Sequence, residues 1–178
     1  GEGLAVTLRS TSGLLHADLR IGANVAAAQP LHANGGLSNR GVIPHGVGML
    51  VTPEEAATLE PNAPLRPYRN GKDLADRPRG VLVIDCYGLS ANEVRQQYPR
   101  LFQWLLERVK PERDAHRDKD LREKWWLHRR NNEELRRSLA GLPYYISTGQ
   151  TAKHRTFQFL DAAILPDDKL IAIGLDDA

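Results

Sequence analysis

Residues 107–127 combine many basic side chains with an adjacent pair of tryptophans, Trp125 and Trp126. Seven arginines and lysines fall within about five helical turns. Basic side chains beside aromatic anchors suit a surface that lies against phosphate groups. Acidic residues alternate with them, so a solvated helix surface whose charges pair with one another is the competing interpretation. The candidate phosphate-contacting residues are Lys110, Arg113, Arg117, Lys119, Arg122 and Lys124.

A second polar tract, residues 148–158, carries long hydrogen-bonding side chains. Arginine and lysine match the O6 and N7 acceptors of guanine in the major groove, and glutamine matches N6 and N7 of adenine. The candidate base-reading residues in this tract are Gln150, Lys153, His154, Arg155 and Gln158. Asn39 and Arg40, in the glycine-rich segment 34–41, are secondary candidates. The competing interpretation is a polar hairpin tip with no ligand.

The residues expected of a catalytic or cofactor-binding site are missing. No glycine-rich phosphate loop with its lysine is present, nor a GxGxxG segment after a strand. The six histidines lack metal-ligand spacing, so we expect no metal site. The lone Cys86 lies in an apolar run and is expected to be a small buried hydrophobe.

Two further segments only partly match catalytic patterns. Asp85 follows an apolar run, as the first acid of a nuclease site would, but no acid-x-lysine partner can be identified. Residues 141–145 end in a Pro-Tyr-Tyr run but lack the amide or carboxylate that an amino-methyltransferase places before its prolines. We therefore expect no catalysis and no bound cofactor from this chain alone.

Composition describes an ordinary globular chain with an uneven charge distribution. The 178 residues are 41% hydrophobic and 26% charged, and the formal net charge is only +2. Basic residues exceed acidic ones by about five between Arg95 and Arg137, which gives that part a positive field. No apolar run has the length of a membrane span and no signal pattern begins the chain, so we expect a cytoplasmic protein without a membrane partner. We also expect the chain to be a piece of a larger protein.

The expected elements indicate an α+β fold of small, mostly antiparallel sheets with a long helical insertion at about 91–141. Thr52 and Ser90 each begin a capping box, and Pro99 and Pro111 should break the insertion. Strands are expected at 4–9, 47–51 and 80–86, and an antiparallel meander is expected from 144–148, 155–160 and 170–173. Asn70 and the glycine after it signal a turn. Because adjacent helix positions point about 100° apart, at least one tryptophan of the pair should be buried and the other partly exposed.

Several blocks of the chain, in order, resemble the target-recognition domain of the MmeI-like family of restriction–modification proteins. Two of them are Arg66-Pro-Tyr-Arg-Asn-Gly-Lys-Asp-Leu74 and Arg122-Glu-Lys-Trp-Trp-Leu127. The other blocks are residues 17–25, 37–42 with 51–56, 79–85, 109–114 and 145–157. No single block is diagnostic, but together they span nearly the whole chain.

The resemblance implies a single DNA target-recognition domain over residues 1–178, excised from a larger adenine-N6 DNA methyltransferase that carries a nuclease as well. Methyl transfer and S-adenosylmethionine binding would then belong to the parent protein. The implied partners are double-stranded DNA and the methyltransferase domain of the same polypeptide. The alternative is a non-catalytic scaffold that joins methyltransferase and nuclease parts and touches DNA only non-specifically.

Overall fold

The computed structural model describes residues 35–152 and 155–175, together with residues 10, 12–15, 21 and 29. The chain divides into two units, Gly1–Gly35 and Gly36–Ala178, and the account below concerns the second. The strand expected at 4–9 lies outside the described residues. A single domain over residues 1–178 stays a prediction.

The first sheet is antiparallel throughout and has the strand order β1-β8-β5-β6. Its strands are β1 (Ser38–Arg40), β5 (Tyr144–Gly149), β6 (Gln158–Asp161) and β8 (Leu170–Ile173). The strands predicted at 144–148 and 170–173 form as β5 and β8, and the strand predicted at 155–160 begins only at Gln158. The predicted meander is wrong. After the β5–β6 hairpin the chain crosses to the other sheet, and β8 returns beside β5 because β5 still has an open edge there.

The second sheet has the order β2-β4-β3-β7, with a parallel pairing between β3 and β7. Its strands are β2 (Leu50–Val51), β3 (Leu65–Arg69), β4 (Leu82–Ile84) and β7 (Leu165–Pro166). The other pairings in this sheet are antiparallel. The expected α+β class with small, mostly antiparallel sheets is therefore confirmed.

Local sequence signals set most helix boundaries. Thr52 and Ser90 close capping boxes at the starts of α1 (Pro53–Ala56) and α3 (Ala91–Gln97), as predicted. Pro99 and Pro111 each occupy the first turn of a new helix, so the insertion is broken into short pieces. The turn expected at Asn70 is instead the N-cap of a further helix, because the Asn70 side chain accepts from two backbone N–H groups.

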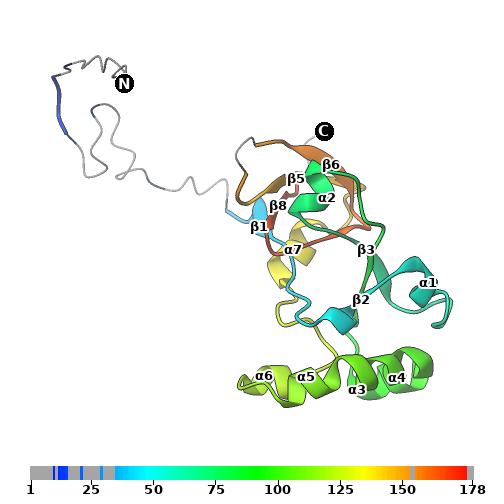
Figure 1. Cartoon of the computed structure of the whole chain (residues 1–178). Coiled ribbons are helices and arrows are strands. Elements are labelled where there is room, and N and C mark those ends of the chain that lie inside the picture. Colours follow the sequence, from blue (N-terminus) through cyan, green and yellow to red (C-terminus); the bar gives the residue numbers. More distant parts are fainter. Residues whose placement is uncertain are drawn as a thin grey trace, which may run out of the picture. The chain divides into compact units, whose positions relative to one another are not determined.

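The helices before and within the insertion are short. The segment before β2 is a 3-10 turn, η3 (Val47–Met49), followed by α1 (Pro53–Ala56) and α2 (Gly71–Ala75). The insertion holds α3 (Ala91–Gln97), α4 (Pro99–Arg108), α5 (Lys110–Asp114), α6 (Lys119–Glu123) and α7 (Glu133–Ser138). Figure 1 shows α3 to α6 as a layer at one end of this unit, with α7 between that layer and the first sheet, near β1.

Two cores lie on opposite faces of the second sheet. In β4, Ile84 belongs to a cluster with helices α3 and α4, while its neighbour Val83 faces Tyr145 and Leu135 in a second cluster. Alternate strand residues point to opposite faces, so one short strand joins both cores. Cys86 is 1% exposed, as expected of a buried hydrophobe, and burial raises the pKa of its thiol to about 12.

The tryptophan pair packs as predicted. Trp125 is 9% exposed and its ring lies 5.6 Å from that of Phe102, in the helical core. Trp126 is half-buried and donates its indole N–H to the carbonyl of Leu89 at 2.9 Å. Both rings therefore serve packing within the unit.

We predict that Trp125→Ala lowers the free energy of unfolding by about 3–5 kcal/mol, because a large buried ring leaves a cavity. Trp126→Phe keeps most of the ring contact and loses one hydrogen bond, so its cost should be about 1 kcal/mol. Urea denaturation of both variants measures the difference. Equal stability of Trp125→Ala and the parent would show that the ring is not part of a packed core.

Gly41 permits a close approach between the segment after β1 and the turn after β7. A Cβ at Gly41 would lie 2.1 Å from the carbonyl oxygen of Pro166 and 2.2 Å from that of Asp167. We predict that Gly41→Ala destabilises the unit by about 1–3 kcal/mol or more, since backbone must move. Gly71→Ala is the control, because a Cβ there meets nothing within 4 Å. Thermal melts should separate the two variants clearly.

Candidate nucleic-acid interface

The loop between β5 and β6 carries several polar residues. In Figure 1 this loop lies at the end of the unit away from α5 and α6. Gln150 and Arg155 are exposed, and the Arg155 guanidinium donates to the carbonyl of Gln150 at 3.4 Å. Gln158 is half-buried at the start of β6, and its amide donates to the carbonyl of Leu74 at 2.7 Å. Lys153 and His154 lie outside the described residues. Within the tract 148–158, Gln150 and Arg155 are therefore the predicted base readers whose side chains the structure shows exposed.

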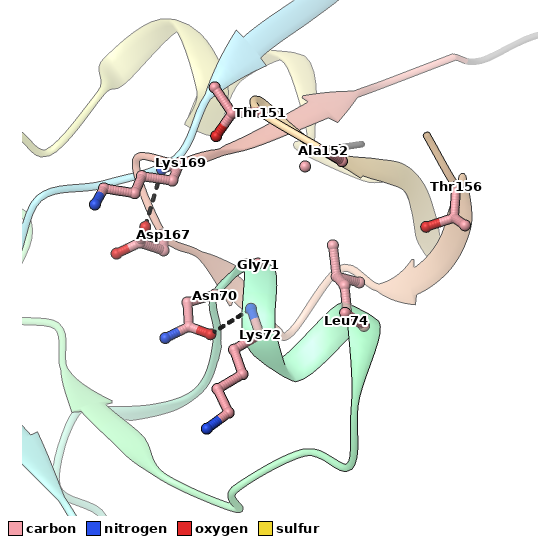
Figure 2. Close-up of a pocket in the computed structure, with 11 residues that line it drawn as sticks. Asn70, Gly71, Lys72, Leu74, Thr151, Ala152, Thr156, Asp167 and Lys169 are labelled. Carbon is pink, nitrogen blue, oxygen red and sulfur yellow. Dashed lines mark hydrogen bonds between the residues drawn. The ribbon is translucent and has the colours of Figure 1, made fainter. Parts of the chain in front are cut away.

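A groove of about 720 Å³ lies beside this loop (Figure 2). One wall is helix α2 and the other is formed by the loop and by the turn between β7 and β8. Two lysines on this groove were not predicted from the sequence, Lys72 on α2 and Lys169 in the turn. No local pattern marks them, since only the tertiary fold brings residues 72, 151 and 169 together. The other lining residues are Asn70, Gly71, Leu74, Ala75, Gly149, Thr151, Ala152, Thr156 and Asp167.

Helix α2 is fixed by an ion pair between the buried carboxylate of Asp73 and the partly exposed guanidinium of Arg79. The Asp73 carboxylate accepts from the Asn70 backbone N–H at 3.0 Å and from two guanidinium nitrogens of Arg79, at 2.9 and 2.8 Å. Burial would raise the pKa of Asp73, but the hydrogen bonds from Arg79 and from the backbone outweigh burial and hold that pKa at about 2. The wall of the groove that carries Lys72 is thus held by electrostatics.

Asp167 lines the same groove, and its carboxylate already has hydrogen-bond partners within the unit. Its carboxylate accepts from the Tyr68 hydroxyl at 2.5 Å and from the Lys169 backbone N–H at 2.9 Å. Burial, and then the hydrogen bond to Asp167, raise the pKa of the Tyr68 hydroxyl, which therefore stays protonated as a donor. The contacts of Asp167 order the turn between β7 and β8.

The two secondary base-reading candidates differ in the structure. Asn39 is 8% exposed, and its amide donates to the Gly36 carbonyl and the Ser138 hydroxyl, so the prediction that it reads bases is corrected. Its amide instead joins β1 to α7. Arg40 is exposed, and its guanidinium bonds to the carboxylate of Asp168 at 2.6 Å.

Arg113 also leaves the set of predicted phosphate contacts. It is 0% exposed, and its guanidinium donates to the carbonyls of Pro44 at 2.7 Å, His45 at 2.9 Å and Leu127 at 3.3 Å. A phosphate on the surface cannot reach a side chain that is fully buried. Arg113 instead fastens the segment before η3 to the helical layer.

The other basic residues of the helical layer lie at the surface. Lys110 pairs with Asp114, Lys119 pairs with Glu123 at 3.5 Å, and the Arg122 guanidinium donates to two carbonyls of its own segment. Arg117 and Lys124 are exposed. Without Arg113, residues 107–124 contain six basic and six acidic side chains, so this surface is neutral. Phosphate contact by these five residues stays a prediction.

The residues of both partial catalytic patterns make structural contacts. The Asp85 carboxylate is held by Arg136 at 2.9 and 2.7 Å and lies 3.7 Å from Arg66. Tyr145 is 2% exposed and donates its hydroxyl to the carbonyl of Ile164, so residues 141–145 do not fit the site of an amino-methyltransferase. In the described part of the chain, no three histidine, cysteine or acidic side chains cluster as metal ligands would.

The described helices include none with the length and apolarity to cross a membrane.

Comparison with family models and with curated proteins finds no match. The fold itself, two small sheets with a broken helical layer, recurs among solved structures. One match is a structure of the type IIL restriction–modification enzyme MmeI in complex with DNA, at a TM-score of 0.63 and 14% sequence identity. The match covers 92% of this chain and 22% of that chain. At this identity the match establishes the fold, and this chain corresponds to about a fifth of the enzyme's length.

We predict that the Asp73–Arg79 pair makes the stability of the unit depend on pH. Because the folded-state pKa of Asp73 is about 2 and its ordinary value is 3.8, the pair stabilises the fold above about pH 4 and loses its effect as the pH falls toward 2. Asp73→Asn should lose about 2 kcal/mol at pH 7 and show a flatter acid limb. Asp76→Asn, an exposed aspartate at the end of the same helix, is the control. Identical acid limbs for Asp73→Asn and the parent in urea titrations would contradict this account.

Proposed function

We propose that this chain is the sequence-specific double-stranded DNA recognition domain of a longer restriction–modification protein. That longer protein would be an adenine-specific DNA methyltransferase. The observation that carries the proposal is the fold likeness over 92% of the chain to an enzyme solved in complex with DNA. The exposed polar loop between β5 and β6 supports it, because base reading needs long donors and acceptors on a rigid base.

The proposal divides the labour between this chain and the rest of a longer polypeptide. Base recognition falls to Gln150, Lys153, His154 and Arg155 in the loop, with Gln158 at its root. Methyl transfer with S-adenosylmethionine, and any DNA cleavage, fall to parts outside this chain. We assign no catalytic step to these 178 residues.

A scaffold role is the second candidate, favoured by a specific observation. The outer face of the first sheet exposes aromatic rings, with Tyr144 58% and Phe159 77% exposed. Exposed apolar patches on a sheet suit contact with another domain. A pure scaffold would bind all DNA sequences alike, so sequence preference separates the two candidates.

We predict that the unmutated chain selects a defined DNA sequence from a pool of randomised duplexes. A true base reader changed to alanine should cost about 1–3 kcal/mol against the cognate base and relax the preference at one position only. Arg155→Ala and Lys153→Ala are the test variants, and Lys124→Ala in the helical layer is the charge-matched control. If the unmutated chain enriches no DNA sequence, the proposed recognition role is wrong. If both variants keep the parent preference at every position, base reading lies elsewhere in the chain.

A further inference from the structure

Basic side chains from four segments of the chain lie around the turn between β7 and β8 and the groove beside it. One Asp168 carboxylate receives two guanidinium groups, from Arg40 at 2.6 Å and from Arg130 at 3.1 Å. The side chains of Arg40 and Arg130 are 43% and 50% exposed, whereas that of Asp168 is 17% exposed. A single acid thus sits beneath two partly exposed cations, and one positive charge remains uncompensated.

The adjoining groove adds two more cations. Lys169 follows Asp168 directly, and Lys72 lies across the groove on α2; both are exposed. We call Arg40, Lys72, Arg130 and Lys169 the basic rim. It holds four positive charges against two negative ones, from Asp167 and Asp168. The exposed charges of residues 107–124 balance, so the rim carries the stronger local positive field.

The rim is continuous with the base of the β5–β6 loop. The backbone N–H of Gln150 donates to the carbonyl of Lys169 at 2.8 Å, and Thr151 lines the groove with Lys72 and Lys169. Side chains that read base edges need phosphate contacts nearby to fix their register on the duplex. Helices α5 and α6 lie at the other end of the unit, away from the loop (Figure 1).

The ion pairs of the basic rim order its two arginines before any anion binds. Asp168 holds Arg40 and Arg130 in place, which lowers the entropy cost of ordering them on binding. Arg40 bonds to Asp168 through Nε and Nη2 and Arg130 through Nη1, so in the described set of bonds each guanidinium retains donors for a phosphate. Lys72 and Lys169 have no ion pair among the described residues.

We propose that the basic rim binds the DNA backbone phosphates that flank the bases read by the β5–β6 loop. This inference rests on the proposed recognition function and names its phosphate-positioning surface. Asp168 is a positioning residue, because it acts through the two arginines. The helical layer then carries few or none of the phosphate contacts.

The test measures the salt dependence of binding to a 30-base-pair duplex carrying the selected sequence, and to a scrambled duplex. The full chain with Lys72→Ala, Arg130→Ala and Lys169→Ala is compared with the parent. Each lost phosphate contact lowers the slope of log K against log salt by about 0.9, so the triple variant should lose about 2–3. Binding to both duplexes should weaken alike, and the sequence preference should survive.

The matched control removes the same charge from the helical layer, through Arg117→Ala, Lys119→Ala and Lys124→Ala. Its slope should equal that of the parent. Should the rim triple variant fail to fold, Lys72→Ala and Lys169→Ala singly provide the test, each with a loss of about 0.9 in slope.

The outcomes separate this inference from the proposed function. An unchanged slope for the rim variant, or a reduced slope for the control alone, overturns the rim and leaves DNA recognition intact. If the rim variant has a reduced slope but the unmutated chain shows no sequence preference, phosphate binding by the rim is supported and sequence-specific recognition is refuted. A parent that binds neither duplex at low salt overturns both.

Discussion

The buried ion pair between Asp85 and Arg136 joins the end of β4 to α7, across the helical layer that separates them in the sequence. Arg136 reaches from α7 with two nitrogens to a carboxylate that is 7% exposed at the end of β4. Arg66 of β3 approaches the same carboxylate and also donates to the carbonyls of Ala162 and Ala163. Burial acts to raise the pKa of Asp85, but the hydrogen bonds from Arg136 outweigh it and keep the acid charged. Loss of one partner from a buried pair costs about 3–5 kcal/mol, so both sheets and α7 depend on it.

Around that pair the unit divides into two ends with different roles. Residues of β4 alternate between a core shared with helices α3 and α4 and a core shared with the first sheet. The helical layer is built by apolar packing and by the buried guanidinium of Arg113. The other end carries the groove, the loop after β5 and the basic rim.

Features that depend on neighbouring residues were predictable from the sequence, and features that depend on distant ones were not. The capping boxes at Thr52 and Ser90 and the breaks at Pro99 and Pro111 follow from backbone chemistry within four residues. The placement of β8 beside β5 depends on which strand edge remains open after the hairpin has formed. In the sequence, Arg113 looks like the exposed basic residues around it. Its burial depends on a distant segment, residues 44 and 45, whose carbonyls accept hydrogen bonds from its guanidinium. The two lysines of the groove were missed for the same reason.

The way the β5–β6 loop is attached has a consequence for how such a domain changes over time. Its two ends are fixed by main-chain and amide hydrogen bonds, from Gln150 to Lys169 and from Gln158 to Leu74. Between them, Thr151, Ala152 and residues 155–157 are exposed and belong to neither core. Substitutions at such positions usually change stability by less than about 0.5 kcal/mol. A lineage can therefore accumulate variants of this loop by neutral drift without compensating changes in the two sheets.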